Sequence, residues 1–585
     1  MKSLFIAVNS KFIHSALAPW YLKAACGPDC GETSVLEYTI NDSPDTVLAG
    51  IYSEQPDLAA FSCYIWNIEF VLKLAANLKK LMPDTIIVFG GPEVSYDVGT
   101  LLDKQPYVDY ILTGEGEASI AGLLRNLASN GACEPQNIPG LVYRDAEGNI
   151  KSNTSDVIEN LDSINSPYTD EMLSAIKGKI AYFESSRGCP FSCSYCLSSI
   201  TRGVRYFSLE RVFRDLTRLA RSGVRQVKFV DRTFNCNRER AAEIINYIIG
   251  NFTDEAGRAM LNFHFEAAAD LFDDSLFEIL SSAPQGLIQF EIGVQTVNPE
   301  ALEAINRKTD LGVLFGNFEK LKALKTVHLH LDLIAGLPYE DYESFARSFD
   351  RVYAAGPHQL QLGFLKLLKG SALREESSRY GFVYRDYPPY EVLSNNFISY
   401  DQLTVLKCIE SLVDRYYNSG RFANTLAYII NNCFDGAFSF YYMLYEFFKQ
   451  KNLIYVSIAQ RELYSILYDF CRSKCEGLEP EIISGLLKLD FLSGDNTGNL
   501  PQVLRTEPES SFREKCFDFL KSEDKLNAYL PLFAGVPAKT IIKHVHFEAF
   551  TYDLLEFKEQ NITVLFDYSC KDPVTGLYSY FKIIF

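Results

Sequence analysis

The chain has 585 residues, of which 47% are hydrophobic and 22% are charged, and its formal net charge is −18. This length predicts two to four domains, and the negative charge argues against general nucleic-acid binding, which needs clustered Lys and Arg. No apolar run approaches the roughly 20 residues that span a bilayer, and the opening MKSLFIAVNSKF indicates a first strand rather than a signal peptide, so we expect a cytoplasmic protein without a membrane partner.

The first 150 residues alternate strand-like and helical patterns. Apolar runs that are typical of strands lie at residues 3–8, 57–64, 85–91 and 108–117. Between the second and third runs, apolar side chains recur at helical spacing until Pro83. Apolar strands joined by amphipathic helices predict a doubly wound parallel sheet, a Rossmann-like α/β domain over residues 1–150, which binds its ligand at the carboxyl ends of the strands.

Two glycine-containing segments follow strands of this predicted sheet. They are Gly90-Gly91-Pro92-Glu93 and Gly114-Glu115-Gly116-Glu117. Glycine allows the backbone to approach a bulky ligand closely, but it is also common in tight turns. From the residues alone, a ligand cradle and simple turns are both open interpretations.

Residues 151–179 are polar, show little periodicity and predict a linker. From there the alternation of strands and helices resumes. Strands are expected at residues 179–186, 225–231, 261–267, 287–294, 328–334 and 358–365. Six successive βα units predict a partial TIM-like barrel over residues 180–380, because eight units close a full barrel. Catalytic residues are expected at the carboxyl ends of these strands.

Residues 381–585 predict a third, mainly helical domain. Its helical segments are rich in Tyr and Phe, as in FDGAFSFYYMLYEFFKQ, and strand-like runs return near the end at NITVLFDY and YSYFKIIF. Aromatic residues bury a large apolar area, so this density predicts a helical core.

Three cysteines lie close together in FESSRGCPFSCSYCLSS. Cys189, Cys193 and Cys196 have the spacing C-x3-C-x2-C, whereas the other cysteines are scattered and predict small buried side chains. Structural zinc would need a fourth ligand, and a redox pair would need only the last two cysteines. A cubane iron–sulfur cluster held by three thiolates leaves one iron open to bind a substrate or cosubstrate.

The triplet, with Tyr195 just before its last cysteine, resembles the signature of the radical S-adenosylmethionine (SAM) superfamily. The resemblance implies a [4Fe–4S] cluster on Cys189, Cys193 and Cys196, SAM on the open iron, and an external electron donor of the flavodoxin or ferredoxin type. Segments that follow the triplet in the expected order strengthen it. They are FEIGVQTVNPEAL, similar to the superfamily's EIGVQS segment, and DLIAGLPYED, similar to its DLI-x-GLP segment.

The same resemblance assigns residues to SAM. The backbone of Asp231, Arg232 and Thr233 is expected near its amino group, Glu291 and Gln295 near its ribose and methionine parts, and the backbone around Ile334, Gly336 and Leu337 near adenine. Two positions depart from the superfamily pattern. Arg232 replaces an acidic residue that is frequent in relatives, and Ala268-Ala269-Asp270 stands where relatives commonly carry an Arg for the SAM carboxylate.

The N-terminal segment resembles the cobalamin-binding domain of B12-dependent radical SAM enzymes, with GGPE and GEGE as the best-matched points. The resemblance implies cobalamin against residues around Ser62 and Tyr64, Gly90, Gly91, Pro92 and Glu93, and Gly114, Glu115 and Gly116. The D-x-H-x-x-G motif that donates a His to cobalt in other cobalamin proteins does not occur, and His14 is the only His of this domain. We therefore expect no His ligand on cobalt. The alternative is a degenerate sheet that only packs on the barrel.

The combined resemblance implies an enzyme, most simply a methyltransferase that acts on an unactivated carbon through a 5′-deoxyadenosyl radical and methylcobalamin. Radical oxidation, cyclisation or rearrangement without net methyl transfer is the alternative among enzymes, and a cobalamin or Fe–S sensor is the alternative of another class. The substrate is not identified by the sequence. The third domain is expected to cover the substrate entrance, with Arg421 as a candidate anchor for an anionic substrate group.

Overall fold

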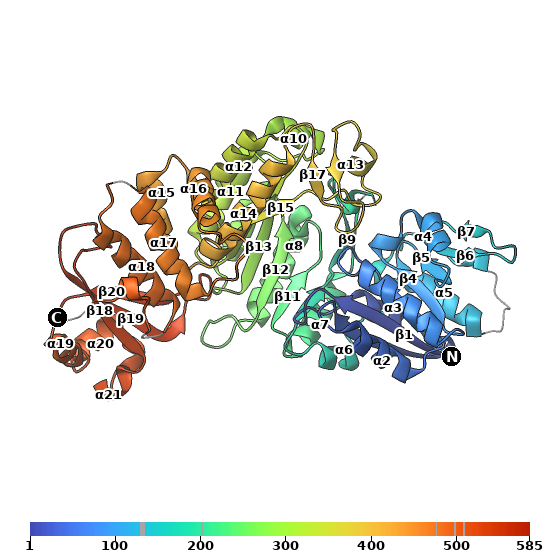
Figure 1. Cartoon of the computed structure of the whole chain (residues 1–585). Coiled ribbons are helices and arrows are strands. Elements are labelled where there is room, and N and C mark those ends of the chain that lie inside the picture. The colour runs from blue at the N-terminus through green and yellow to red at the C-terminus, as the bar shows by residue number, and fades with distance from the viewer. Residues whose placement is uncertain (129–134, 201–202, 476, 497–498, 507–508) are drawn as a thin grey trace.

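The computed structural model describes residues 1–128, 135–200, 203–475, 477–496, 499–506 and 509–585. Three parts follow one another along the molecule: an N-terminal sheet domain at one end, a parallel barrel in the middle and a mainly helical region at the other end (Figure 1). None of the helices in the described ranges combines the length and the apolar character that crossing a bilayer requires.

The N-terminal sheet has the strand order β2-β1-β3-β4-β5-β6-β7. Its strands are β1 (Lys2–Asn9), β2 (Glu32–Thr39), β3 (Leu58–Ser62), β4 (Ile86–Gly90), β5 (Tyr110–Leu112), β6 (Leu141–Arg144) and β7 (Ile150–Ser152). The first five are parallel, and β6 and β7 extend the sheet antiparallel. The four predicted strands are present as β1, β3, β4 and β5. The prediction missed β2, β6 and β7. The edge strand β2 is partly exposed and lacks a continuous apolar run.

Helices cover both faces of this sheet. They are α1 (Ala18–Ala25), α2 (Pro44–Glu54), α3 (Ile68–Leu81), α4 (Val98–Lys104) and α5 (Gly116–Ala128). Leu4 and Ile6 of β1 belong to one apolar cluster and Phe5 to another, because successive side chains of a strand point to opposite faces. Because both faces of the sheet are apolar and covered by helices, a polar ligand can bind only at the ends of the strands. The strand order turns at β1, between β2 and β3, which is where such sheets form a crevice.

The middle part is an open barrel of parallel strands in the order β15-β14-β13-β12-β11-β8. These are β8 (Ile180–Phe183), β11 (Gln226–Phe229), β12 (Asn262–Ala267), β13 (Ile288–Gln295), β14 (His328–Ala335) and β15 (Gln359–Phe364). The six predicted strands and the predicted incomplete barrel are confirmed. The segment before it contains helix α6 (Asp170–Ala175), capped by the Thr169 side chain.

Helices follow the barrel strands, and each longer one begins at a polar cap. They are α7 (Leu209–Ala220), α8 (Arg238–Asn251), α9 (Asp274–Ser281), α10 (Pro299–Ala304), α11 (Leu311–Ala323) and α12 (Tyr342–Ala355). The side chains that accept a backbone hydrogen bond from the first turn are Ser208, Asn237, Asp273, Asn298, Asp310 and Asp341. Such caps satisfy N–H groups that have no partner inside the helix, so the sequence itself marks these helix starts.

The open edge of the barrel is covered by α14 (Tyr400–Tyr416), which packs beside β15. Just after this helix, Asn418 accepts a hydrogen bond from Leu360 N at 2.8 Å and donates one to Leu360 O at 2.9 Å. The chain reaches α14 through α13 (Ala372–Glu375), β16 (Val383–Tyr384) and β17 (Val392–Ser394). Two backbone groups of the edge strand β15, the N–H and C=O of Leu360, are thereby paired within the chain.

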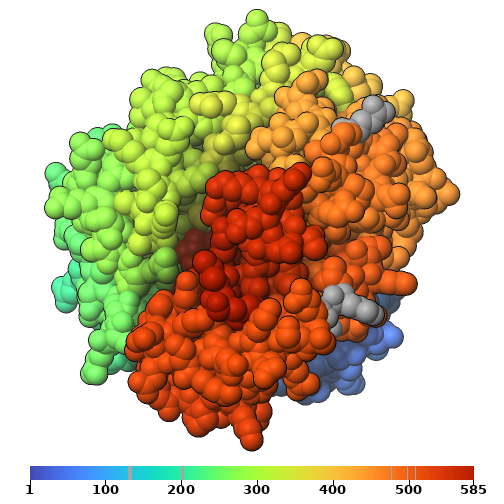
Figure 2. All heavy atoms as spheres, turned by 90° about the vertical axis from the view of Figure 1, so that its left-hand side faces the viewer, coloured from blue at the N-terminus to red at the C-terminus, as the bar shows by residue number. Residues whose placement is uncertain are grey.

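The rest of the C-terminal part is mainly helical, as expected. Its elements are α15 (Ala423–Cys433), α16 (Ala437–Gln450), α17 (Gln460–Lys474), α18 (Pro480–Gly494), α19 (Phe512–Phe519), α20 (Glu523–Tyr529), α21 (Ala538–Ile541), β18 (Val545–Phe550), β19 (Ile562–Lys571) and β20 (Tyr578–Ile583). The last three form an antiparallel sheet, and β19 and β20 are the two strand-like runs seen in the sequence. From this end, the surface is hollowed between the barrel, in green and yellow-green, and the last residues, in red (Figure 2).

Candidate functional site

The cysteine loop follows β8 at the carboxyl end of the barrel strands. Cys189 ends the short strand β9 (Ser186–Cys189), which pairs with β10 (Gly203–Tyr206). Cys193 and Cys196 flank a turn in which Cys196 N donates a hydrogen bond to the Cys193 carbonyl at 3.1 Å. The Cys189 Sγ lies 3.5 Å from the Thr233 Oγ1, and an Arg307 Nη1 lies 3.9 Å from the Cys193 Sγ. The loop is therefore anchored to the ends of neighbouring barrel segments.

The donor set offers three thiols, one fewer than the four ligands of a structural zinc site. Burial raises the pKa of Cys193, although the nearby Arg307 partly opposes this. Within the described ranges, no three His, Cys, Asp or Glu side chains are placed to hold one metal ion together. In a cubane each thiolate binds its own iron, so the sulfurs stay further apart than the ligands of one tetrahedral zinc. Three thiols on one loop fit such a cluster.

Arg307 is a cation that the sequence analysis missed. It follows α10, and its guanidinium reaches back to the Gly293 carbonyl of β13 as well as to Cys193. Its Nε is buried without a hydrogen-bond partner. The Arg that commonly binds the SAM carboxylate in relatives is replaced here by the segment with Ala268 and Asp270. Arg307, which follows the next strand β13, is a candidate for that cation. Its only signal in the sequence is the basic NRK segment after the β13 motif.

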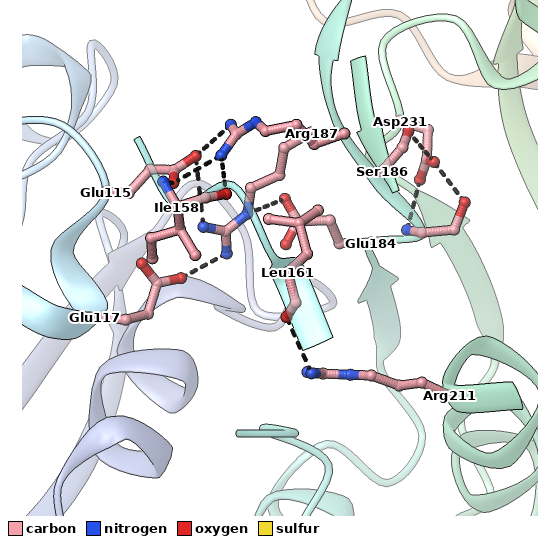
Figure 3. Close-up of polar contacts among 11 residues, drawn as sticks. Glu115, Glu117, Ile158, Leu161, Glu184, Ser186, Arg187, Arg211 and Asp231 are labelled. Atoms are coloured by element: carbon pink, nitrogen blue, oxygen red, sulfur yellow. Dashed lines mark hydrogen bonds and ion pairs between the residues drawn. The ribbon is translucent and has the colours of Figure 1, made fainter. Parts of the chain in front are cut away.

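The side chain of Asp231 has a structural function. It is buried and accepts hydrogen bonds from Ser185 N at 2.9 Å, Ser185 Oγ at 2.6 Å and Ser186 Oγ at 2.5 Å, contacts that Figure 3 shows in part. These bonds join the ends of β8 and β11. Because the Asp231 side chain is used in these bonds, the predicted contact with SAM falls to the backbone of this segment. Arg232 is exposed, and the Thr233 hydroxyl contacts the Cys189 sulfur.

Glu291 and Gln295 lie on β13 at different depths. Burial alone would raise the pKa of Glu291, but hydrogen bonds from His264 and Lys228 lower it to about 2. Gln295 is at the strand end in the left-handed region, at φ 73°, and its Oε1 is buried without a partner. An unpaired buried acceptor beside the cysteine loop fits a polar ligand such as SAM.

The adenine segment follows β14. Ile334 is half-buried and Leu337 is fully buried. Gly336 has a φ of 91°, and its carbonyl accepts a hydrogen bond from Asn395 Nδ2 at 2.9 Å. Tyr195 packs against the barrel core beside Cys193. These four assignments stay predictions.

A cavity of about 890 Å³ lies between the N-terminal sheet and the barrel. From the N-terminal side its lining includes all the residues predicted for cobalamin: Ser62, Tyr64, Gly90, Gly91, Pro92, Glu93, Gly114, Glu115 and Gly116. From the barrel side it includes Glu184, Lys228, Arg232 and Glu266. One space therefore touches the carboxyl ends of the strands of both domains.

Gly91 shows why this segment contains glycine. Its φ is 116°, and a Cβ at this position would lie 2.5 Å from the Cys63 carbonyl oxygen. Any other residue would be strained there and would push the β4 loop away from β3.

Acidic residues of the N-terminal loops bind across the domain boundary. Glu115 pairs with Arg205 at 2.6 Å and with Arg187 at 3.7 Å, and Arg187 also binds Glu117 and Glu184 (Figure 3). The carboxylates of the segment at residues 114–117 therefore connect the two domains. In this segment, the glycines are the residues that can approach a ligand.

Glu93 makes a second connection of this kind. Its buried carboxylate binds Lys369 at 2.8 Å and accepts a hydrogen bond from the Tyr390 hydroxyl, both from the chain after the barrel. His14 also lines the cavity, with its Nδ1 2.8 Å from the Tyr182 hydroxyl of β8. That cobalt has no His ligand stays a prediction.

Arg421 lies away from the cysteine loop. It follows Asn418, which binds the first residues of β15, so Arg421 is near the amino ends of the barrel strands. Its Nη1 lies 2.6 Å from the Asp495 Oδ2. This placement gives no support to the substrate-anchor prediction. Beside the cysteine loop is a cavity of about 1060 Å³, and the chain after the barrel reaches it through residues 372–380.

Comparison with family models separates the three parts of the chain. The model of the B12 binding domain matches residues 3–124, and the model of the radical SAM superfamily matches residues 183–352. The chain carries a B12-binding domain and a radical SAM domain. These domains imply cobalamin, a [4Fe–4S] cluster and SAM as cofactors. A third model, described as a protein of unknown function (DUF4080), matches residues 378–566.

Relatives with known names share the first two domains. The cobalamin-dependent radical SAM methyltransferase TokK of Streptomyces tokunonensis is 28% identical over 56% of this chain and 50% of its own length. The hopanoid C-3 methylase of Methylococcus capsulatus is 29% identical over 50% of this chain and 55% of its own length. The matched part thus spans about half of each relative.

Solved structures share the fold. The cobalamin-dependent SAM radical enzyme OxsB with aqua-cobalamin and SAM bound has a TM-score of 0.59 at 15% identity, covering 91% of this chain and 83% of its own. The methyltransferase TsrM from Kitasatospora setae, with cobalamin and a [4Fe–4S] cluster bound, has a TM-score of 0.52 at 19% identity, covering 67% of this chain and 79% of its own. The α/β sheet domain, the partial barrel and the helical C-terminal part are the fold predicted from the sequence.

Proposed function

We propose that the chain is a cobalamin-dependent radical SAM methyltransferase that acts on an unactivated carbon. The observation that carries the proposal is the single cavity lined by the predicted cobalamin loops and by the barrel strand ends. A methyl group can pass between cofactors only if their binding sites open into one space. The two relatives described by name as methyltransferase and methylase support the choice.

Each part of the site has a function in this proposal. Cys189, Cys193 and Cys196 would hold the cluster, with Arg307 close to its thiolates. When bound, the cluster supplies an electron to SAM and cobalamin supplies a carrier for the methyl group. The Glu115–Arg205 and Glu93–Lys369 pairs hold the two domains against each other beside this cavity.

Two products separate this proposal from its alternatives. Anaerobically reconstituted protein is incubated with SAM, a reductant and an extract of small molecules. We expect both 5′-deoxyadenosine and S-adenosylhomocysteine, because radical formation and methyl donation each consume SAM. 5′-Deoxyadenosine without S-adenosylhomocysteine would instead favour oxidation, cyclisation or rearrangement, and neither product would favour a sensor. We also propose a flavodoxin or ferredoxin as the electron donor and the cytoplasm as the location.

A further inference from the structure

The inner face of the radical SAM barrel carries polar residues in successive rows. In one row across β11 to β14 the paired residues are Lys228, His264, Gln289 and His328. In the next row across β12 to β15 they are Glu266, Glu291, His330 and Gln359. Asp332 and Gln361 are paired above them. We call the first two sets the lumen rows.

Folding alone does not require polar lumen rows. In closed βα barrels the interior is commonly filled by Val, Ile and Leu. Here the apolar alternates, such as Phe263, Phe290 and Leu331, pack in the core on the other face of the strands. A polar group removed from water costs free energy unless it is hydrogen-bonded. The lumen rows therefore suit a space that holds water or a polar ligand.

The rows are already partly connected by hydrogen bonds. One oxygen of Glu291, Oε2, lies 3.1 Å from the Lys228 Nζ and 2.9 Å from the His264 Nε2. His330 Nε2 lies 2.8 Å from the Gln289 Nε2 and 3.0 Å from the His328 Nδ1. These contacts fix the side chains in place, so their free donors and acceptors form a rigid pattern.

The lumen rows carry little uncompensated charge. Burial, reinforced by neighbouring His residues, lowers the pKa of His328 to about 4 and that of His330 to about 3, so both rings are neutral at pH 7. Burial also lowers the pKa of His264, so its contact with Glu291 is a hydrogen bond to a neutral ring, and Lys228 supplies the opposing charge. Burial raises the pKa of Glu266, and the positive charge of Arg232 partly opposes this.

The rows connect with the space between the domains. Lys228, Glu266 and Arg232 also line the 890 Å³ cavity on which the cobalamin loops open. At the amino ends of the strands, the β19–β20 connection comes close, because a Cβ on Gly286 would lie 2.8 Å from Pro573. A molecule held by the lumen rows would thus lie between the C-terminal part and the cofactor cavity.

We propose that the lumen rows bind the substrate, and that it is a small neutral or zwitterionic molecule rich in hydrogen-bonding groups, of the kind of a sugar, a nucleoside or an amino acid. This inference rests on the proposed function. A long-chain lipid would cover the rows without pairing their donors and acceptors. Within the lumen rows the one Lys or Arg is Lys228, which is already paired with Glu291, so a polyphosphate would meet no cluster of unpaired cations there.

Binding is measured on full-length protein loaded with cobalamin and SAM, with the cluster kept oxidised so that no turnover occurs. Saturation-transfer NMR is recorded with three defined pools: neutral sugars, nucleosides and amino acids; sugar and nucleoside phosphates; and long-chain fatty acids and isoprenoid alcohols. Saturating SAM keeps nucleosides out of the SAM site. We expect binding from the first pool only. Binding from either of the other pools, or none from any pool, overturns the inference.

Variants then locate the binding. His330→Leu removes a ring of the second row, and we expect it to weaken binding of the identified ligand by about tenfold, the scale of one lost hydrogen bond. His330→Gln keeps hydrogen-bonding capacity and should recover most of the affinity, which separates the role from a folding defect. The matched control is His546→Leu, on β18 of the C-terminal sheet, which should leave affinity unchanged. Equal affinity in His330→Leu and His546→Leu would place the ligand elsewhere and overturn the inference.

The proposed function and the proposed substrate class can be tested separately. If 5′-deoxyadenosine forms without S-adenosylhomocysteine while the first pool still binds, methyl transfer is wrong and the substrate class stands. If both products form but only lipids or phosphates bind, the substrate class is wrong and methyl transfer stands.

Discussion

The two parallel sheets of the molecule bury different kinds of surface. In the N-terminal sheet, β3 is buried at every residue, and both faces carry apolar clusters. In the barrel, β13 alternates buried and half-buried residues over its whole length. The N-terminal sheet can therefore bind a ligand only beyond its strand ends, whereas the barrel has strand ends and a polar inner face. Two kinds of site result, one for cofactors and one suited to a substrate.

The cysteine loop is the strand-end feature with the largest expected effect. We expect Cys193→Ala to abolish SAM cleavage and to lower the iron content, because a cubane cannot be held by two thiolates on this loop. Iron analysis and 5′-deoxyadenosine yield are the measurements. Cys516→Ala changes a cysteine buried in the C-terminal part and should keep full activity. Full cleavage by the Cys193 variant would contradict the cluster assignment.

Gly91 tests the strand ends of the N-terminal sheet. Gly91→Ala should weaken cobalamin binding by about tenfold or more, because the left-handed φ costs about 1–2 kcal/mol and the Cβ meets the Cys63 carbonyl. Absorbance titration measures the affinity. Gly257→Ala has a similarly positive φ of 75° but open space around it, so it should lose some stability and no cobalamin affinity. If both variants bind cobalamin like the parent protein, the β4 loop is not part of the site.

Glu291 tests the inner face of the barrel. Glu291→Gln should lower the free energy of unfolding by about 2 kcal/mol at pH 7, because Lys228 loses its opposing charge. The folded pKa of about 2 lies below the ordinary value of 4.5, so this contribution is present above pH 4.5 and is lost as the pH falls towards 2. Denaturant unfolding at pH 7 and pH 3 measures the difference.

A similar network in the C-terminal sheet provides the control for Glu291. Glu548 binds Lys488 at 3.0 Å and His546 at 2.9 Å. Glu548→Gln should also destabilise the chain at pH 7, but only Glu291→Gln should weaken SAM binding, since the sequence resemblance assigns Glu291 to SAM. Unchanged SAM affinity in Glu291→Gln would contradict the assignment of Glu291 to SAM.

The smallest effect is expected at Arg421. Arg421→Ala removes one ion pair with the partly exposed Asp495, which contributes at most about 1 kcal/mol. SAM cleavage and substrate affinity should stay at the parent level, because Arg421 does not belong to the lumen rows and its guanidinium is already paired with Asp495. A large rise in the KM of Arg421→Ala for the substrate, with an unchanged melting temperature, would support the prediction that Arg421 anchors the substrate.

Local patterns carried most of the fold prediction. Apolar runs located β1, β3, β4 and β5, and strand–helix alternation located all six barrel strands. The edge strand β2 and the strand β18 were not predicted, because strands that are only partly buried lack a continuous apolar run. The aromatic residues after position 415 were expected to form a core, and Tyr416, Phe440 and Tyr441 are fully buried.

The candidate site was only partly predictable. Spacing marked Cys189, Cys193 and Cys196, and Gly91 was marked by its position after a strand. The sequence could not show that the Glu115 carboxylate pairs with Arg205, since the two are 90 residues apart. Arg307 and the lumen rows also depend on strand register and tertiary contact, which a single sequence does not specify.

The central claim is that the two domains form one site, and hydrogen exchange tests it most directly. Exchange is measured by mass spectrometry on reconstituted protein with and without cobalamin, before SAM is added. We predict that cobalamin alone slows exchange both in the N-terminal loops at residues 62–66, 90–93 and 114–117 and at the barrel strand ends at residues 228–233 and 266–268. Protection confined to the N-terminal loops would contradict a shared cavity.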